Sequence, residues 1–333
     1  MVLRELEREG TEVMNAIGHD EGLREGTRRV VVVGGANTDI AGLSAARLIY
    51  GDSNPGHVRI SAGGVARNIA ENLARLGVNT RLVTAFGDDA NARDLARECR
   101  DAGIGVEESL VVSGLSGPVY LSIMDDGGDM ALALNDMRAL DELTPAVLEA
   151  RTRVLDEADL IVVDTNLPAE TIAWLAEYAH SPLLLDAVSV AKAPRAAPVL
   201  SRMHTIKASG LEAGVLLGRE IRNRDHAEEA ARELVALGVS RAFVTAGAFG
   251  VAWADGAACG RLPAPKVEEI RNASGAGDAF AAGIAYATLA TWPTAKAAAF
   301  GSACAAVTLE SEDTVNVGVT LEAITNRMEA MLT

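Results

Sequence analysis

The segment from Asn272 to Gly283 reads NASGAGDAFAAG and places one carboxylate, Asp278, directly after Gly275, Ala276 and Gly277. An alanine-rich helix is predicted to begin there, so its first N–H groups lack partners and carry partial positive charge. Glycines let that backbone approach an anion closely. An aspartate in the first turn can accept a proton from an attacking hydroxyl while the amides stabilise a transferring phosphoryl group. From this segment alone, complementing the helix dipole is the commoner role for an aspartate in a first turn, such as Asp278.

Other nucleotide-binding and metal-binding patterns are absent from the sequence. It contains no GxxxxGK[ST] loop, and GAGDAF does not complete the GxGxxG fingerprint, which disfavours an NAD-binding oxidoreductase. None of the five histidines has the spacing of a metal-binding pair, which argues against zinc.

The elements that must position Asp278 are indicated by short apolar runs that alternate with helical patterns. Strands are predicted within residues 28–42, 80–87, 158–166, 181–189, 204–209 and 241–247, and a polar, strand-like stretch within 267–271. Helices are predicted over 66–76, 95–102, 169–179 and 227–237, the first of them stopped by Gly77. This alternation predicts an α/β fold, a doubly wound and mostly parallel sheet flanked by helices, with its site at the carboxyl ends of the strands.

Two segments break the alternation and are interpreted as a small β lid over the site. They cover about residues 41–61 and 117–134, and the second contains the turn signal DDGGD. We therefore expect one domain over residues 29–333 that carries this lid. Residues 1–28 are interpreted as a charged N-terminal extension with no assigned function.

Composition limits the partners and the compartment. The formal charge of −16 argues against nucleic acid as a partner but leaves a small phosphorylated ligand open, because local amides and single cations can hold it. The three cysteines are scattered, which favours free thiols in a reducing cytoplasm. No apolar run approaches the ~20 residues needed to span a membrane, and the N-terminal residues lack a signal-peptide core.

Two motifs, some two hundred residues apart, carry a resemblance to a known family. SAGGVARNIAENLARLG (Ser61–Gly77) and GAGDAFAAG (Gly275–Gly283) resemble the two signatures of the ribokinase-like (PfkB) sugar and nucleoside kinases, in the family's order. The resemblance extends from Arg29 to the C-terminus. It implies a ribokinase-like fold, Asp278 as catalytic base, an anion hole formed by the amides of residues 275–277, and ATP with Mg²⁺.

Within that family, five stretches are most similar to the pseudouridine kinases. They span residues 34–42, 50–77, 135–145, 186–195 and 308–316, and the SNPG segment before the Gly63-Gly64 pair is the most discriminating. The resemblance implies transfer of the ATP γ-phosphoryl group to the 5′-hydroxyl of pseudouridine.

The acceptor residues that the resemblance implies have suitable chemistry. Asp39, in an Asn37-x-Asp39 pattern, can accept hydrogen bonds from two vicinal ribose hydroxyls. Gly63 and Gly64 let the main chain approach the sugar, and the Asn68 amide offers both a donor and an acceptor. The remaining expected substrate-binding positions are Asn135, beside the lid, and Asn166, at the end of a predicted strand.

The expected nucleotide residues lie in the C-terminal half. VTAGAFG resembles the family's segment near ATP and supplies Thr245, Gly247 and Gly250, while Lys207 and Ser209 precede Glu212. The resemblance implies that this glutamate organises Mg²⁺ through water, because phosphate-bound Mg²⁺ keeps several waters. It also implies a K⁺ site, with Asn272, Ser274 and the segment 311–316 in the positions that provide its ligands.

Three departures keep other functions open. Ser209 and Gly210 stand where the family pattern has asparagine and arginine, and Ala187 stands where it has proline. The first of these departures can weaken handling of Mg·ATP. The alternatives are therefore a related kinase with another acceptor, such as ribose or a purine nucleoside, and a weakly catalytic nucleoside-binding protein. Lid strands of this family often pair between subunits, so the resemblance also implies a homodimer.

Overall fold

The computed structural model describes Leu23 and residues 28–332. Apart from Leu23 and Arg28, the N-terminal extension predicted over residues 1–28 lies outside the described residues. Within the described part, no helix is both long enough and apolar enough to cross a membrane.

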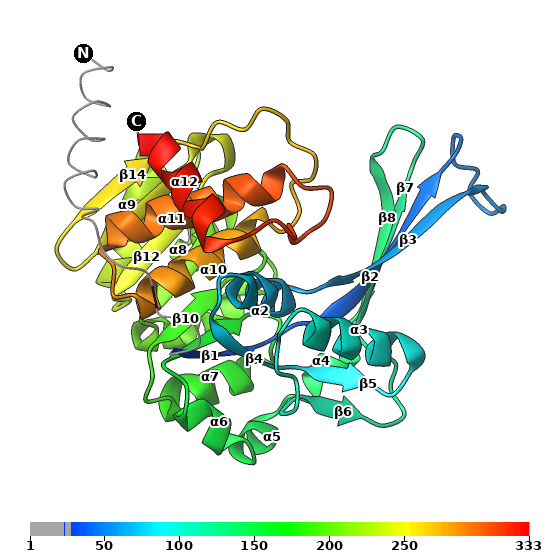
Figure 1. Cartoon of the computed structure of the whole chain (residues 1–333), viewed down its shortest axis with the longest axis horizontal. Coiled ribbons are helices and arrows are strands. Elements are labelled where there is room, and N and C mark those ends of the chain that lie inside the picture. Colours follow the sequence, from blue (N-terminus) through cyan, green and yellow to red (C-terminus); the bar gives the residue numbers. More distant parts are fainter. Residues whose placement is uncertain (1–22, 24–27, 333) are drawn as a thin grey trace.

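The body of the molecule is built on an eight-stranded sheet that is parallel over six strands (Figure 1). The order across the sheet is β14-β13-β12-β11-β10-β9-β1-β4, and β13 and β14 add antiparallel pairs at one edge. The strands are β1 (Arg29–Val33), β4 (Asn79–Val83), β9 (Leu160–Asp164), β10 (Leu183–Asp186), β11 (Thr205–Ser209), β12 (Arg241–Thr245), β13 (Val251–Asp255) and β14 (Cys259–Leu262).

Helices cover both faces of this sheet, which is why its strands read as continuous apolar runs. In β1, Val30 and Val32 belong to one hydrophobic cluster, and Val31 and Val33 belong to the other. The first cluster is completed by α2 (Val65–Arg75), α3 (Ala90–Asp101), α10 (Ala276–Leu289), α11 (Thr294–Leu309) and α12 (Leu321–Leu332). The second is completed by α4 (Arg138–Asp141), α5 (Pro145–Glu149), α6 (Thr152–Asp156), α7 (Ala169–Tyr178), η1 (Ala193–Arg202), α8 (Gly210–Leu217) and α9 (Arg224–Ala236).

A four-stranded sheet projects from this body and forms the lid (Figure 1). Its order is β3-β2-β7-β8, from β2 (Asn37–Ser44), β3 (Gly56–Gly63), β7 (Val119–Met124) and β8 (Met130–Asp136). β2 pairs with β7 in parallel and the other two pairs are antiparallel. The DDGGD segment forms the β7–β8 turn, in which the Asp125 N–H donates to Asp129 O at 2.8 Å. A separate two-stranded sheet pairs β5 (Ala85–Gly87) with β6 (Leu110–Val112).

The predicted α/β fold with a small β lid is confirmed, with differences in detail. The single strand run predicted within residues 28–42 is two strands, since β1 ends at Val33 and lid strand β2 begins at Asn37 and includes Asp39. The strand-like stretch predicted at residues 267–271 is wrong, because that segment has no regular secondary structure. Its polar residues continue the exposed connection from β14 to α10, where strand pairing would bury no apolar face.

Candidate active site

Charged and polar side chains gather where the parallel strands end. Asp164 and Asp186 are the last residues of β9 and β10, and Lys207 follows on the neighbouring strand β11. Asp278 lies in the first turn of α10, and its carboxyl is close enough to feel the charges of all three. The carboxyl edge of a parallel sheet is the usual ligand-binding edge of such folds.

The Asp278 carboxyl is buried and is held from the lid side of the molecule. Asn68, in α2, donates from Nδ2 to Asp278 Oδ2 at 2.8 Å. The pKa of Asp278 is raised to about 7. Burial is the main cause and the nearby Asp186 and Asp164 carboxylates add to it, while Lys207 and the Asn68 hydrogen bond act in the opposite direction. A carboxyl with this pKa can accept a proton near neutral pH, which suits a general base.

The turn before Asp278 has a shape that requires glycine. Gly275 caps α10 with φ of 80°, and a Cβ there would lie 1.9 Å from the Thr314 carbonyl oxygen. The first bond within the helix runs from the Ala279 N–H to Gly275 O, so the N–H groups of Ala276 and Gly277 lie at the open N-terminus. These are the amides that the sequence pattern assigned to an anion.

Lys207 lies against this turn. Its Nζ is 3.0 Å from the point where a Cβ on Gly277 would be placed, and 3.1 Å from Asp186 Oδ2 on the adjacent strand. Asp186 is fully buried and Lys207 nearly so. Asp186, a residue that sequence analysis did not assign to the site, therefore belongs to it.

The expected sugar-binding residues Asp39, Gly63 and Gly64 meet at the base of the lid. Asn37 donates from Nδ2 to Asp39 Oδ1 at 2.5 Å, and burial raises the pKa of Asp39. A Cβ on Gly63 would lie 2.1 Å from Asp39 Oδ2, so the carboxylate rests on bare backbone. Gly64 has φ of 98° and passes close to the Gly35 carbonyl, where a Cβ would be 2.5 Å from the oxygen.

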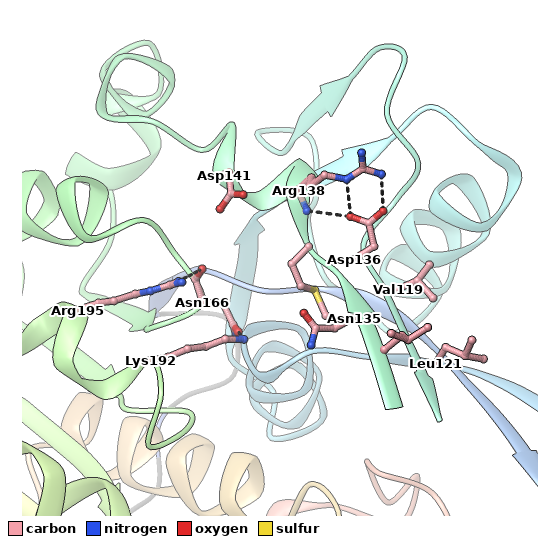
Figure 2. Close-up of a pocket in the computed structure, with 11 residues that line it drawn as sticks. Val119, Leu121, Asn135, Asp136, Arg138, Asp141, Asn166, Lys192 and Arg195 are labelled. Atoms are coloured by element: carbon pink, nitrogen blue, oxygen red, sulfur yellow. Dashed lines mark hydrogen bonds and ion pairs between the residues drawn. The ribbon is translucent and has the colours of Figure 1, made fainter. Parts of the chain in front are cut away.

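A cavity of about 680 Å³ lies beside this base and contains Asn135 and Asn166 (Figure 2). Asn166 is oriented by Lys192, whose Nζ donates to its Oδ1 at 2.6 Å. Arg195 Nη1 donates to the backbone carbonyls of residues 165–167. The remaining wall comes from the lid and α4, through Val119, Leu121, Leu134, Asp136, Met137, Arg138 and Asp141.

Asp164 joins these regions and was missed by the sequence reasoning. Its Oδ2 accepts from the N–H of Gly35 at 2.9 Å, the N–H of Ala66 at 3.0 Å and Asn166 Nδ2 at 3.0 Å. This fully buried carboxylate therefore ties the turn after β1 and the start of α2 to Asn166. The available signal was an aspartate that ends an apolar strand at the ligand-binding edge.

Ser209, Thr245 and Gly247 line a second cavity of about 290 Å³, together with Gly210 and the unpredicted Arg222. Gly250 does not line it. A Cβ on Gly250 would lie 2.0 Å from Leu262 O, so this glycine serves the packing of the β-hairpin.

Ser209 and Glu212 form a capping box at the start of α8. Ser209 Oγ accepts from the Glu212 N–H at 3.3 Å, and Glu212 Oε2 accepts from the Ser209 N–H at 2.7 Å. The serine thus caps the helix, as an asparagine can, and no described residue donates a hydrogen bond to the second carboxylate oxygen of Glu212.

The two segments expected to hold K⁺ lie together. Asn272 Nδ2 donates to the Glu312 carbonyl at 3.0 Å, and Asn272 Oδ1 accepts from the Ser274 N–H at 2.9 Å. Among the described residues, no group of three or more His, Cys, Asp or Glu could hold a metal ion by itself. Glu212, whose Oε1 lies outside the capping box, could hold through water an Mg²⁺ that arrives on phosphates.

The chain is similar to known kinases over most of its length. A family model described as pfkB family carbohydrate kinase matches residues 27–320. Pseudouridine kinase of Escherichia coli K12 is 34% identical over 90% of this chain and 96% of its own. The uncharacterized sugar kinase YeiI of the same organism is 34% identical over 84% of this chain and 78% of its own. A structure of Arabidopsis thaliana ribokinase with ribose and ATP has a TM-score of 0.82 at 19% identity, covering 91% of this chain and 99% of that one, which shows the shared fold.

Proposed function

The chain belongs to the pfkB family of carbohydrate kinases, and we propose that it transfers the γ-phosphoryl group of ATP to the 5′-hydroxyl of pseudouridine. The observation that carries this proposal is the bond from Asn68 to Asp278 at 2.8 Å. This bond connects α2, which begins directly after Gly64, to Asp278, which directly follows Gly277. It therefore connects the expected sugar-binding backbone to the expected anion-binding turn. An acceptor hydroxyl and a phosphoryl group can therefore meet at one carboxyl group.

In the proposed reaction, Asp278 accepts the proton of the 5′-hydroxyl as that oxygen attacks the γ-phosphorus. The new O5′–P bond forms while the bond from the γ-phosphorus to the β–γ bridging oxygen breaks, and ADP leaves. The amides of Ala276 and Gly277 stabilise the charge on the phosphoryl oxygens, and Asn68 keeps the carboxyl aimed at the hydroxyl.

Nucleotide binding is assigned to the second cavity, with Ser209, Thr245 and Gly247 in its wall and Lys207 toward the phosphates. Bound Mg²⁺ would neutralise phosphate charge, and Glu212 would hold it through water. Asn272, Ser274 and the carbonyls near Glu312 would hold K⁺ beside the glycine turn. The capping box supports retained activity despite Ser209, because it fixes Glu212 as firmly as an asparagine cap would.

The acceptor would bind between the lid and the sheet. Asp39 would accept from the ribose 2′- and 3′-hydroxyls, with Gly63 and Gly64 beneath the sugar. The base would enter the larger cavity, where Asn135 and Asn166 supply donors and acceptors for its two ring N–H groups and two carbonyls.

We assign a homodimer to the apolar face of the lid. The strand registers place Val58, Ile60 and Leu132 on one face, and these side chains are 70%, 62% and 55% exposed. Apolar groups in such a cluster favour burial against a partner, here the same face of a second lid. Val58→Glu should lower the molecular mass measured by sedimentation, and an unchanged mass would place any interface elsewhere.

The acceptor is tested by ADP release with Mg·ATP, with and without K⁺, across pseudouridine, uridine, cytidine, adenosine, inosine and ribose. Pseudouridine should give the largest kcat/KM. Turnover that favours ribose or another nucleoside would keep the chemistry and replace the acceptor, an alternative that the similarity to a sugar kinase supports. Binding of pseudouridine without any turnover would instead indicate a nucleoside-binding protein.

A further inference from the structure

Asp186 is a buried ionisable residue without a role in the reaction described above. Its Oδ1 accepts from the Val188 N–H at 2.9 Å, in a turn where Val188 has φ of 57°. Its Oδ2 is buried and lies 3.1 Å from Lys207 Nζ. A branched residue with positive φ is uncommon, so the backbone after β10 adopts a strained shape that holds this carboxylate.

Lys207 is held by Asp186 on one side and by a glycine on the other. β10 and β11 are parallel neighbours whose register pairs Asp186 with Lys207, so the two side chains leave the sheet together. On the far side the ammonium faces the bare backbone of Gly277, where a Cβ would lie 3.0 Å from Lys207 Nζ. An ammonium has three N–H donors, and among the described residues Asp186 is the ion-pair partner of Lys207. Two donors therefore remain for an anion at the glycine turn.

We propose that Asp186 is a positioning residue, which fixes the Lys207 ammonium beneath the amides of Ala276 and Gly277 so that it contacts the transferring phosphoryl group. Burial makes this arrangement effective, because a charge held in a dry site needs no reorganisation during the reaction. An unpaired buried lysine would lose its proton or move toward solvent. Asp186 prevents both outcomes.

The same pair also acts on the proposed base. The charged or polar groups that face Asp278 are Lys207 on β11, Asp186 on β10, Asp164 on β9 and Asn68 on α2. Lys207 lowers the pKa of Asp278, whereas Asp186 raises it. Asp186, Glu212 and Asp278 in turn raise the pKa of Lys207 against the opposing effect of its burial, so the lysine stays charged.

This inference rests on the proposed kinase reaction and is tested by a double-mutant cycle with Asp186→Asn and Lys207→Met. Lys207→Met should lower kcat by ~10²-fold and move the acid limb of the kcat/KM profile to higher pH. Asp186→Asn should lower kcat by about tenfold with little change in the acceptor KM. Both losses are measured well above the acid limb, where Asp278 is ionised in every variant and its own interaction with Asp186 does not change the rate. There, Asp186→Asn should have almost no further effect on kcat in the Lys207→Met background, because Asp186 acts through that lysine.

Equal losses from Asp186→Asn in both backgrounds would overturn the inference. Asp101→Asn, which removes an exposed carboxylate at the end of α3, is the matched control for charge and should leave kcat unchanged. If Asp186→Asn does not fold, Gly277→Ala replaces it. The methyl group of Gly277→Ala would push the Lys207 ammonium away from the glycine turn. Gly277→Ala should therefore lower kcat in the wild-type background and have almost no effect on kcat in the Lys207→Met background.

A failure of the proposed kinase reaction can be distinguished from a failure of this inference by a binding measurement. If the wild-type protein phosphorylates no acceptor, the kinase proposal fails, and the same cycle is measured as Mg·ADP affinity by calorimetry. A non-additive loss of affinity would then support the Asp186–Lys207 unit, and additive losses would contradict it.

Discussion

Asn68 and Asp278 are 210 positions apart in the chain and share a hydrogen bond of 2.8 Å between α2 and α10. The two family motifs in the sequence thus meet side chain to side chain. This contact positions the carboxyl, and it also favours the ionised form, because a hydrogen bond to the charged state lowers a pKa.

The pH profile of kcat/KM should report Asp278. Burial is the main cause that raises its pKa to about 7, and the base must be ionised to accept a proton. We therefore expect kcat/KM for the acceptor to fall about tenfold per pH unit below this value and to level above it. A profile that is flat from pH 5 to pH 8 would exclude Asp278 as the titrating base.

Asn68→Ala should shift that profile. The substitution removes the hydrogen bond that lowers the pKa of Asp278, so the acid limb should move to higher pH. Activity lost at pH 7 should be partly recovered at pH 8.5. A uniform loss at every pH would mean that Asn68 acts only on acceptor binding.

The layered fold was predictable because its signals are local. Alternating apolar runs and helical patterns identified the parallel strands from β1 to β12, and GAGDAF identified the first turn of α10. The antiparallel edge strands β13 and β14 were missed, because short strands with glycine and charged residues give little periodic signal.

Candidate site residues that belong to a local sequence motif could be predicted, whereas residues that reach the site only through tertiary packing could not. Asp278, Gly277 and Lys207, each selected from a motif, lie together in the fold, and their roles in the reaction stay predictions. Asp164 and Asp186 were not recognised, since each reads as the end of an apolar strand. Their roles depend on parallel strand register and on a turn around Val188, which no local pattern encodes.

Asp39→Ala should separate the two substrates. The carboxylate rests on Gly63 at the base of the lid, away from the nucleotide cavity. Loss of its hydrogen bonds to the sugar should raise the acceptor KM by ~10–100-fold and change the ATP KM much less. Steady-state kinetics with each substrate varied in turn measure this, and an equal rise in both constants would mark Asp39 as a structural residue.

Ser209 variants test the most serious departure from the family pattern. Ser209→Ala removes the side-chain cap of α8, so the Glu212 N–H loses its acceptor while the Glu212 carboxylate keeps its bond from the residue 209 N–H. The loosened first turn should destabilise the protein by about 1 kcal/mol and raise the KM for ATP. Ser209→Asn preserves an N-cap and should match or exceed the wild-type kcat. A loss of more than about tenfold in Ser209→Asn would mean that the hydroxyl itself contacts the nucleotide.

The most direct measurement is ³¹P NMR detection of pseudouridine 5′-phosphate made from Mg·ATP by the wild-type protein and by Asp278→Asn. Removing the buried carboxyl should leave the variant folded, with a Tm at pH 8 no lower than that of the wild type, since a raised pKa destabilises the ionised native state. We expect rapid formation of the 5′-phosphate by the wild type and a rate lowered by ~10²–10⁴-fold in the folded variant. If Asp278→Asn retains more than roughly a few per cent of the wild-type rate, that small loss would contradict Asp278 as the base of this kinase.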